Sequence, residues 1–526
     1  MKHLQILCSK YLFLLIFLIC TNSVANAQSY PYPEKWGEIE KKESEGLLKS
    51  TKPLVDEIYI QSKKDGLPQQ KIKALLYQSK IEIITEGGKQ QEVKLYNRFK
   101  EEIQAATTIE RSILQSLLAE LLNEYFQQHR YQISNRTNED TTSKNDDFLT
   151  WSEAAYKKEI KTLYDTSIVN VKQLQKEPIG NWIFILDTAK QYRELRPTIF
   201  DLLAHRAISY YLANNEQERA EDVLGILLKQ HSSDVSRNAY LYNSLLNIKL
   251  KTKASDDNQL VQLKALSRLN PKAWYTAEIL LQLANAYQQK LSAEPKERYA
   301  ERKRYADSIL YICEQANELY LATNGNKQLQ LIKKNILAPE ISIQTERFNI
   351  PKQSIPVYLS HKNVNKIYVK VLKYKKSTSG YFANEFNAWR DIKKQQDVDS
   401  LLNIYPEVEF YAITLKKFDD YDQHTTIAKF NALDDGAYIA LISNNESFKL
   451  DSVNTILFQS IDVSANSLVF KESDLLLTDR NSGQPISKGE IAIYEPSGNG
   501  KDLQLLEKLI TNENGRASYN NNKPSL

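Results

Sequence analysis

The fold is decided by a turn near the end of the chain, Asp479-Arg480-Asn481-Ser482-Gly483-Gln484-Pro485. It separates the apolar run Leu475 to Leu477 from the alternating segment Glu490 to Tyr494. In that segment Ile491 and Ile493 fall on one face of a strand, because side chains alternate between the two faces. Asn, Ser, Gly and Pro are the residues that tight turns favour. The stretch is therefore predicted to be strand, turn, strand, and a further strand from Leu503 to Thr511 follows it.

The sequence upstream of this turn alternates in the same way from Ala338-Pro339 onward. The expected strands contain Ile341 and Ile343, then residues 356–359, 367–371, 408–415, 425–430, 438–441 and 456–461. An amphipathic segment between Tyr381 and Leu402 interrupts them. About seven short strands over roughly 120 residues are typical of an immunoglobulin-like β-sandwich. In the segment Leu433 to Tyr438, Gly436 is predicted to permit a tight turn and Tyr438 to pack at the corner.

From Trp36 to about Asn335 the hydrophobic period is helical. The clearest helix carries Ile109, Ile113, Leu114, Leu117, Leu118, Leu121, Leu122, Tyr125 and Phe126 on its apolar positions. Thr107 and Glu110 stand where a capping box would open it. Pro197 is expected in the first turn of another helix, and further helices are expected around residues 220–229, 239–251, 274–290 and 305–321. Short polar joints between them predict antiparallel helix pairs in a solenoid-like array without a fixed repeat length. The polar stretch from Ser134 to Asp147 is predicted to be an exposed loop.

Three segments resemble one family. The turn at Asp479 to Pro485 with its strands, followed by Thr511 to Gly515 in the pattern Thr-x-x-Asn-Gly, resembles the second macroglobulin domain of bacterial alpha-2-macroglobulin-like proteins. Leu433 to Tyr438 resembles the preceding macroglobulin domain, and Arg196 to Ala207 resembles a run in the helical N-terminal region of the same proteins. The sequence patterns divide the chain into an expected signal peptide at 1–27, a helical domain at 28–337, a β-sandwich at 338–462 and a partial second sandwich at 463–526. The resemblance implies that both sandwiches are macroglobulin domains.

The N-terminus has the features of an export signal. Lys2 and Lys10 precede the apolar run Tyr11 to Cys20, and Ala25-Asn26-Ala27 supplies small residues for cleavage after Ala27. The apolar run is shorter than the about 20 residues that span a bilayer, and no later stretch is apolar enough. Ile19 before Cys20 argues against lipidation at that cysteine. The mature chain is therefore expected in the periplasm, the cell envelope or the medium, without a transmembrane segment.

The composition gives no support for two classes of binding partner and limits the disulfides. The 69 basic and 65 acidic residues are nearly balanced, which gives no argument for binding nucleic acid or an acidic membrane. Cleavage after Ala27 would leave Cys313 as the last of the 3 cysteines, so no intramolecular disulfide is expected.

No residue is assigned a catalytic, cofactor-binding or metal-binding role. In the resembled family the chemistry belongs to a thioester between a Cys and a Gln three positions later, but Cys313-Glu314-Gln315 has the wrong spacing and lies in a predicted helix, where the two side chains diverge.

The six histidines, at 3, 129, 205, 231, 361 and 424, show no helical or hairpin pairing of the kind that zinc sites use. His205 is expected to be structural, hydrogen-bonded across helices. The acidic pairs beginning at Asp256, Asp419 and Asp434 are read as loop residues, and no phosphate loop or Gly-x-Ser-x-Gly elbow is present.

The function implied by the resemblance is inhibition of endopeptidases by trapping, in which a protease cuts a bait segment and is enclosed. In the resembled family the bait and the thioester lie downstream of these domains, so both would lie beyond Leu526. Residues 463–526 also hold too few strands for a complete sandwich, so this chain is expected to be the N-terminal part of a longer protein. This chain is then expected to be a scaffold that binds proteases through a downstream part, with no cofactor and no enzyme activity. Two alternatives remain: a periplasmic or surface interaction protein with sandwich spacers, and a carbohydrate-active or peptidase enzyme with a downstream catalytic domain.

Overall fold

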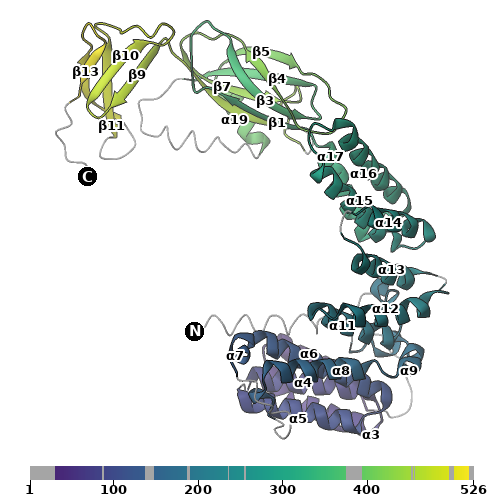
Figure 1. Ribbon diagram of the computed structural model, residues 1–526. Coiled ribbons are helices and arrows are strands. Elements are labelled where there is room, and N and C mark those ends of the chain that lie inside the picture. Colours follow the sequence, from purple (N-terminus) through teal and green to yellow (C-terminus); the bar gives the residue numbers. More distant parts are fainter. Residues whose placement is uncertain are drawn as a thin grey trace. The chain divides into compact units, whose positions relative to one another are not determined.

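The computed structural model describes residues 30–85, 88–136, 147–185, 190–234, 236–253, 256–374, 394–451, 454, 456–496 and 503–519 (Figure 1). The expected signal peptide and most of the polar stretch between Ser134 and Asp147 lie outside these residues. The chain divides into two compact units. The first comprises residues 1–286 with 322–325, and the second comprises 287–321 with 326–526. Each unit is considered by itself.

The first unit is an array of helices, as the hydrophobic period predicts. Its α-helices are α2 (Tyr32–Ser44), α3 (Lys52–Lys64), α4 (Pro68–Thr85), α5 (Lys89–Ala105), α6 (Thr108–Gln128), α7 (Arg130–Ser134), α8 (Glu153–Ser167), α9 (Val171–Lys176), α10 (Lys190–Arg193), α11 (Ile199–Ala213), α12 (Gln217–His231), α13 (Asn238–Lys251) and α14 (Asp257–Leu269). Neighbouring pairs such as α3 with α4, α11 with α12 and α12 with α13 pack together. One large core runs from α4 to α12, and a smaller one lies under α2 to α4.

The ends of the helices follow the capping residues. Thr107 is the N-cap residue of α6, and its backbone N–H donates to the Glu110 carboxylate at 3.4 Å, as the capping-box pattern predicts. The prediction for Pro197 was wrong in detail, because α11 begins at Ile199. Thr198 is the N-cap residue, and its hydroxyl accepts from the Asp201 backbone N–H at 3.3 Å, so side-chain capping rather than proline sets the start of this helix.

The second unit begins with helices and continues with strands. Helix α15 (Thr276–Ala293) spans the boundary between the units, α16 (Tyr299–Leu319) lies in the second unit, and α17 (Asn324–Leu337) follows. The strands of the first β-domain are β1 (Glu340–Thr345), β2 (Phe348–Asn349), β3 (Ile355–Lys362), β4 (Lys366–Tyr374), β5 (Glu407–Thr414), β6 (His424–Phe430), β7 (Gly436–Ser443) and β8 (Ile456–Val463). The seven expected strands are thus confirmed, and the two-residue strand β2 is an addition.

These strands form a β-sandwich. One sheet has the order β1-β3-β6 and the other the order β2-β8-β7-β4-β5. Val357 and Leu359 from the first sheet and Val369 and Ile442 from the second are fully buried between them. Such alternate apolar residues from two facing sheets are what a sandwich core requires.

The described part of the amphipathic segment between Tyr381 and Leu402 covers one face of the larger sheet. Helix α19 (Gln395–Ile404) packs Val398 and Leu401 against the outer face of the five-stranded sheet, where Leu441 and Phe448 are also buried. That sheet is therefore covered on both faces.

The corner before β7 is built as predicted. Gly436 has φ 154°, and the Tyr438 hydroxyl donates to the Asp434 carbonyl at 3.0 Å. A Cβ on Gly436 would lie 3.3 Å from that hydroxyl, so the corner favours glycine.

The second β-domain contains the turn that decided the fold. Its strands are β9 (Asn466–Lys471), β10 (Asp474–Asp479), β11 (Glu490–Pro496), β12 (Leu503–Ile510) and β13 (Arg516–Ser518). Asp479 Oδ1 accepts from the Ser482 backbone N–H and hydroxyl, both at 2.8 Å, and Gly483 adopts φ 70°. The turn closes an antiparallel bridge between Thr478 and Pro485, with the Asp479 N–H donating to the Gln484 carbonyl at 2.8 Å. The chain then passes to the other sheet, because β10 lies in the sheet β13-β10-β9 whereas β11 pairs with β12. A small core of Leu475, Leu477 and Ile491 lies between these two sheets.

Candidate functional site

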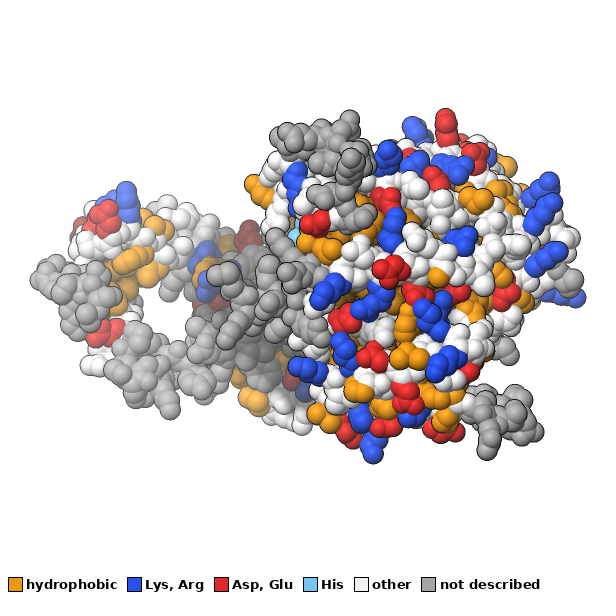
Figure 2. All heavy atoms as spheres, turned by 90° about the horizontal axis from the view of Figure 1, so that it is seen from below, with side chains coloured by type: hydrophobic (Ala, Val, Ile, Leu, Met, Phe, Trp, Pro, Cys, Tyr) orange, Lys and Arg blue, Asp and Glu red, His pale blue; other side chains and the backbone are white. Residues whose placement is uncertain are grey.

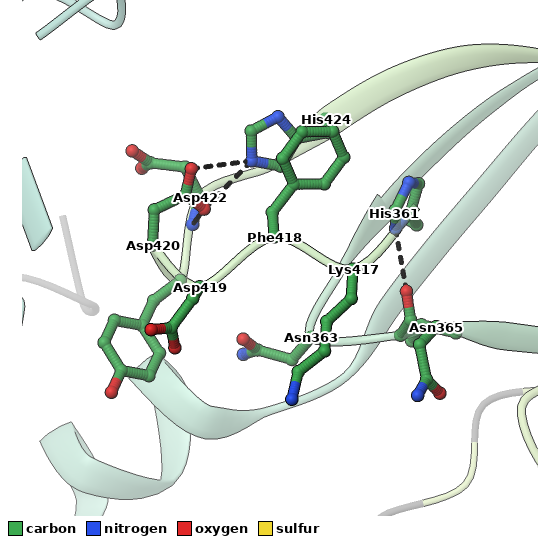
Figure 3. Close-up of a pocket in the computed structure, with 11 residues that line it drawn as sticks. His361, Asn363, Asn365, Lys417, Phe418, Asp419, Asp420, Asp422 and His424 are labelled. Carbon is green, nitrogen blue, oxygen red and sulfur yellow. Dashed lines mark hydrogen bonds and ion pairs between the residues drawn. The ribbon is translucent and has the colours of Figure 1, made fainter. Parts of the chain in front are cut away.

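The candidate site is a pocket of about 260 Å³ at one end of the sandwich (Figure 3). Its walls come from the turn between β3 and β4 and from the loop between β5 and β6. The lining residues are His361, Asn363, Val364, Asn365, Lys417, Phe418, Asp419, Asp420, Tyr421, Asp422 and His424. The β3–β4 turn is tight because Asn363 takes the left-handed conformation at φ 55°, which asparagine tolerates.

Two histidines meet at this pocket, through a pairing that is neither helical nor hairpin and so lies outside the patterns sought in the sequence. Strands β3 and β6 align His361 directly opposite His424, with ring centroids 6.4 Å apart. The sequence shows no such pairing because β3 and β6 are not a hairpin and two further strands, β4 and β5, lie between them in the chain. Cross-strand neighbours of this kind follow from the sheet register alone.

Each ring is fixed by its surroundings. His424 Nε2 donates to the two oxygens of Asp420 at 2.9 and 3.0 Å, and the ring stacks on Phe418 at a centroid distance of 3.5 Å. His361 Nδ1 donates to the Val364 carbonyl at 2.9 Å, as Figure 3 also shows. Burial is the main cause that lowers the pKa of His361, and the charge of His424 acts in the same direction. His361 is therefore held neutral.

The same loop binds helix α16 within the second unit. The Arg302 guanidinium makes a bidentate ion pair with Asp422, at 2.7 and 2.6 Å, and its remaining nitrogen donates to the carbonyls of Leu291 and Glu294 at the end of α15. Bidentate arginine–carboxylate pairs are among the stronger polar contacts in proteins. The Asp422 carboxylate raises the pKa of Arg302, so the clamp stays charged.

A second contact from the turn reaches α17. Asn363 Nδ2 donates to the carbonyls of Ile336 at 2.8 Å and Ala338 at 3.1 Å, and Lys362 Nζ donates to the Asn335 carbonyl at 2.9 Å. These three carbonyls lie at the end of the helix, where backbone acceptors have no helical partner. The pocket is thus the polar joint between the last helices and the sandwich.

The chemistry available at this joint is limited. Its lining residues include neither Ser nor Cys to act as a nucleophile, and Asp420 and Asp422 are held by His424 and Arg302. Among the described residues no group of three His, Cys, Asp or Glu side chains is arranged to hold a metal ion. The arrangement is that of a rigid polar contact.

Of the residues discussed from sequence, the pair Asp419 and Asp420 lies in the β5–β6 loop of this pocket, whereas Cys313, Asp256 and His205 do not line it. Cys313 is buried in α16 with its Sγ 3.2 Å from the Leu329 carbonyl, and burial raises its pKa to about 11. Gln315 is exposed and its amide donates to the Tyr311 hydroxyl, so it does not face Cys313. Asp256 is the N-cap residue of α14.

His205 is buried in α11, and its ring packs against Tyr242 of α13 with centroids 4.8 Å apart. Burial is the main cause that lowers its pKa to about 3, so the ring is neutral. Asn243 of α13 interacts with it and opposes this shift.

A buried charged cluster in the first unit was missed. His231 at the end of α12 contacts Asp201 through Nε2 at 2.6 Å and Asp234 through Nδ1 at 2.5 Å. Asp201 is 0 % exposed and also accepts from the Thr198 backbone N–H and hydroxyl. In the sequence, only the three-residue spacing of His231 and Asp234 could have indicated this cluster, because Asp201 belongs to another helix.

Comparison with known proteins gives a short result. No family model matches the sequence, and no curated protein matches it. Among solved structures, part of the chain is similar to native alpha-2-macroglobulin from Escherichia coli spanning domains NIE-MG1, at 17% identity and a TM-score of 0.25, covering 36% of this chain and 89% of that one. A structure of the same protein spanning MG0-NIE-MG1 matches at 15% identity and a TM-score of 0.24, covering 35% and 59% of the two chains. Matches of this size do not decide the family.

Two surface properties complete the description. Figure 2 shows basic and acidic side chains intermingled on the face that it presents, in keeping with the balanced composition. Within the described part of the chain, no helix combines the length and the apolar character needed to cross a membrane.

Proposed function

We propose that this chain is the N-terminal scaffold of an exported alpha-2-macroglobulin-like protein whose complete form inhibits endopeptidases by trapping them. The observation that supports this most is the succession of a helical array, a β-sandwich and a second β-domain that contains the turn Asp479 to Pro485. Each of the three quoted sequence resemblances falls in a different one of these parts.

The chain itself is proposed to carry no enzyme activity. Two polar clusters described above support this, because their charged side chains bind one structural element to another. Arg302 with Asp422 joins α16 to the sandwich, and Asp201 with His231 joins α11 to α12. A scaffold needs such fixed joints so that a distant event is transmitted to whole domains.

The test uses the whole product of the gene that encodes this chain. It is incubated with endopeptidases of different specificity, and hydrolysis of casein is compared with hydrolysis of a small chromogenic peptide. Trapping predicts loss of casein hydrolysis with the peptide activity retained, because an enclosed protease still admits small substrates. A protease that keeps both activities at a molar excess of the protein contradicts the proposal.

The reading frame after Leu526 gives an independent test. Further sandwich domains and a Cys-x-x-Gln segment are expected there. A catalytic module directly after that residue would favour an enzyme, and the absence of a bait and thioester region would favour the interaction protein.

A further inference from the structure

The two β-domains of the second unit are joined by a very short linker. β8 ends at Val463 and β9 begins at Asn466, so Ser464 and Ala465 alone connect them. Successive domains of one chain usually move relative to each other unless their interface is large and apolar. Such movement takes place at a few linker residues whose backbone angles can change. The partners of the linker backbone therefore decide whether it acts as a hinge.

The N–H groups of the linker are bound largely by the first β-domain. The Ser464 N–H donates to the carbonyl of Asn349 in β2 at 2.9 Å. The Ala465 N–H donates to Oδ2 of Asp435, just before β7, at 3.1 Å. The N–H of Asn466 donates to the Ser464 hydroxyl at 3.2 Å. Each N–H from 464 to 466 thus has an acceptor, and the first β-domain supplies two of these acceptors.

The carbonyl groups of the same three residues are all bound by Arg480, which follows β10 directly. Its Nε donates to the Ser464 carbonyl at 3.1 Å, and a terminal nitrogen donates to the Asn466 carbonyl at 2.8 Å. Its backbone N–H donates to the Ala465 carbonyl at 2.7 Å. A guanidinium is planar and presents its donors in a fixed arrangement, so it also fixes the two carbonyls that it binds.

The Arg480 side chain also reaches the first β-domain. Its guanidinium lies over the ring of Phe348 in β2, 5.1 Å from the ring centroid. A cation is attracted by the electron-rich face of an aromatic ring. Next to Arg480, the Asn481 Oδ1 accepts from Gln353 Nε2 at 3.2 Å, which is a further contact between the turn and the first β-domain. Arg480 therefore contacts both β-domains and the linker between them.

We propose that Arg480 is an interdomain clasp, which closes the hinge at Ser464 and Ala465 so that the two β-domains move as one body. Rotation of the linker backbone would break hydrogen bonds on both sides, because every N–H and C=O group of residues 464–466 has a protein partner. The turn then has two roles, since Asp479 shapes it and Arg480 ties it to the preceding domain. The clasp is independent of whether the complete protein inhibits endopeptidases.

The test measures the spread of distances between two spin labels by pulsed electron paramagnetic resonance, in the whole chain without its expected signal peptide. In a Cys313→Ala background, Ile427→Cys and Glu513→Cys place labels at exposed positions of the first and the second β-domain. Ile427→Cys with Glu446→Cys lies within the first β-domain and supplies the width of a rigid reference. We expect the two widths to be similar in the natural chain. Arg480→Met should widen the interdomain distribution at least about twofold, because an open linker lets the domains move.

Arg347→Met is the matched control. The Arg347 guanidinium also lies 5.1 Å from the centroid of the Phe348 ring, but its side chain is 79 % exposed and pairs with Asp462, at 4.0 Å, rather than with the linker. This variant removes a similar cation–aromatic contact and should leave the interdomain width unchanged. An equal effect of Arg347→Met and Arg480→Met would overturn the proposal.

A second variant acts from the first β-domain. Asp435→Ala removes the acceptor of the Ala465 N–H and should also widen the interdomain distribution, while hydrogen exchange in β10 stays slow. If Arg480→Met speeds exchange in β10, the second β-domain itself has loosened, and the width measured for Asp435→Ala decides. A natural chain whose interdomain width far exceeds the reference refutes the clasp, and so does a width that Asp435→Ala and Arg480→Met both leave unchanged.

Discussion

Replacing His231 by Gln should destabilise the first unit, and the loss should depend on pH. The imidazole lies between two carboxylates, Asp201 at 2.6 Å and Asp234 at 2.5 Å, and is itself only 2 % exposed. Burial lowers the pKa of His231, but the hydrogen bonds and charges of the two aspartates outweigh it, so the pKa is raised. The protonated ring is the form that the folded state prefers.

The magnitude follows from what the substitution leaves behind. Removing one partner of a buried ion pair typically costs about 3–5 kcal/mol, because the other charge stays buried. Asp201 retains its bonds from the Thr198 backbone N–H at 3.0 Å and hydroxyl at 2.6 Å. We therefore expect His231→Gln to lower the free energy of unfolding by the lower end of this range, about 3 kcal/mol near pH 5.5. For a unit of this size that corresponds to a fall of about 6–12 °C in Tm, at about 2–4 °C per kcal/mol.

The direction of the pH dependence is fixed by linkage. A group whose pKa is higher in the folded than in the unfolded chain stabilises the fold fully below the unfolded value, which is about 6.5 for histidine. That contribution is lost as the pH rises through the raised folded value. The difference in Tm between the natural chain and His231→Gln should therefore be largest below about pH 6 and shrink in alkaline solution.

The assay is thermal unfolding followed by circular dichroism at 222 nm between pH 5 and pH 9. Thr198→Ala is the matched control, because it removes a cap from the same cluster without removing a titrating group and should cost about 1 kcal/mol at every pH. A loss for His231→Gln that is the same at pH 5 and pH 9, or that grows with pH, would refute the reasoning.

Three further predictions concern the second unit. Arg302→Met should destabilise it by about 2–4 kcal/mol in denaturant unfolding, because a clamp to a carboxylate and two carbonyls is lost. Arg298→Met, at the exposed N-cap position of the same helix, removes only an exposed ion pair with Glu294 and should change the stability by less than about 0.5 kcal/mol. Gly515→Ala should speed hydrogen exchange in β10 and β13 far more than Gly483→Ala: both glycines have φ near 70°, but a Cβ on Gly515 would lie 2.5 Å from the Leu477 carbonyl oxygen and one on Gly483 would meet nothing within 4 Å. Cys313 should resist a thiol reagent at pH 8 until the chain is unfolded, because burial raises its pKa to about 11; rapid labelling of the folded chain would contradict this.

Local patterns predicted the elements well. The apolar positions from Ile109 to Phe126 all lie in α6, and Thr107 opens that helix as its N-cap residue. The turn at Asp479 and the corner at Tyr438 were also predicted from a few adjacent residues. In each case the forces involved act between neighbours in the chain, namely helix period, capping and turn conformation.

Contacts between distant elements were not predictable in this way. The turn after Asp479 connects two strands that lie in different sheets, and no residue of the turn specifies this. Burial depends on which strands become neighbours, and a single sequence does not carry that information.

The histidines show how contacts between distant elements, which the sequence does not predict, decide whether a residue has a functional role. His205 attracted attention by its local neighbours, yet the structure buries it between α11 and α13, where the ring stays neutral. His361 and His424 attracted none, but the β3–β6 register sets them face to face beside Asp420. His231 is the clearest case, since its charge depends on Asp201 thirty residues earlier in another helix. A titratable side chain acquires its role from tertiary neighbours, because only these decide its solvation and its charge partners. In this chain those partners join helix to helix, as Asp201 does with His231, and helix to sandwich, as Asp422 does with Arg302.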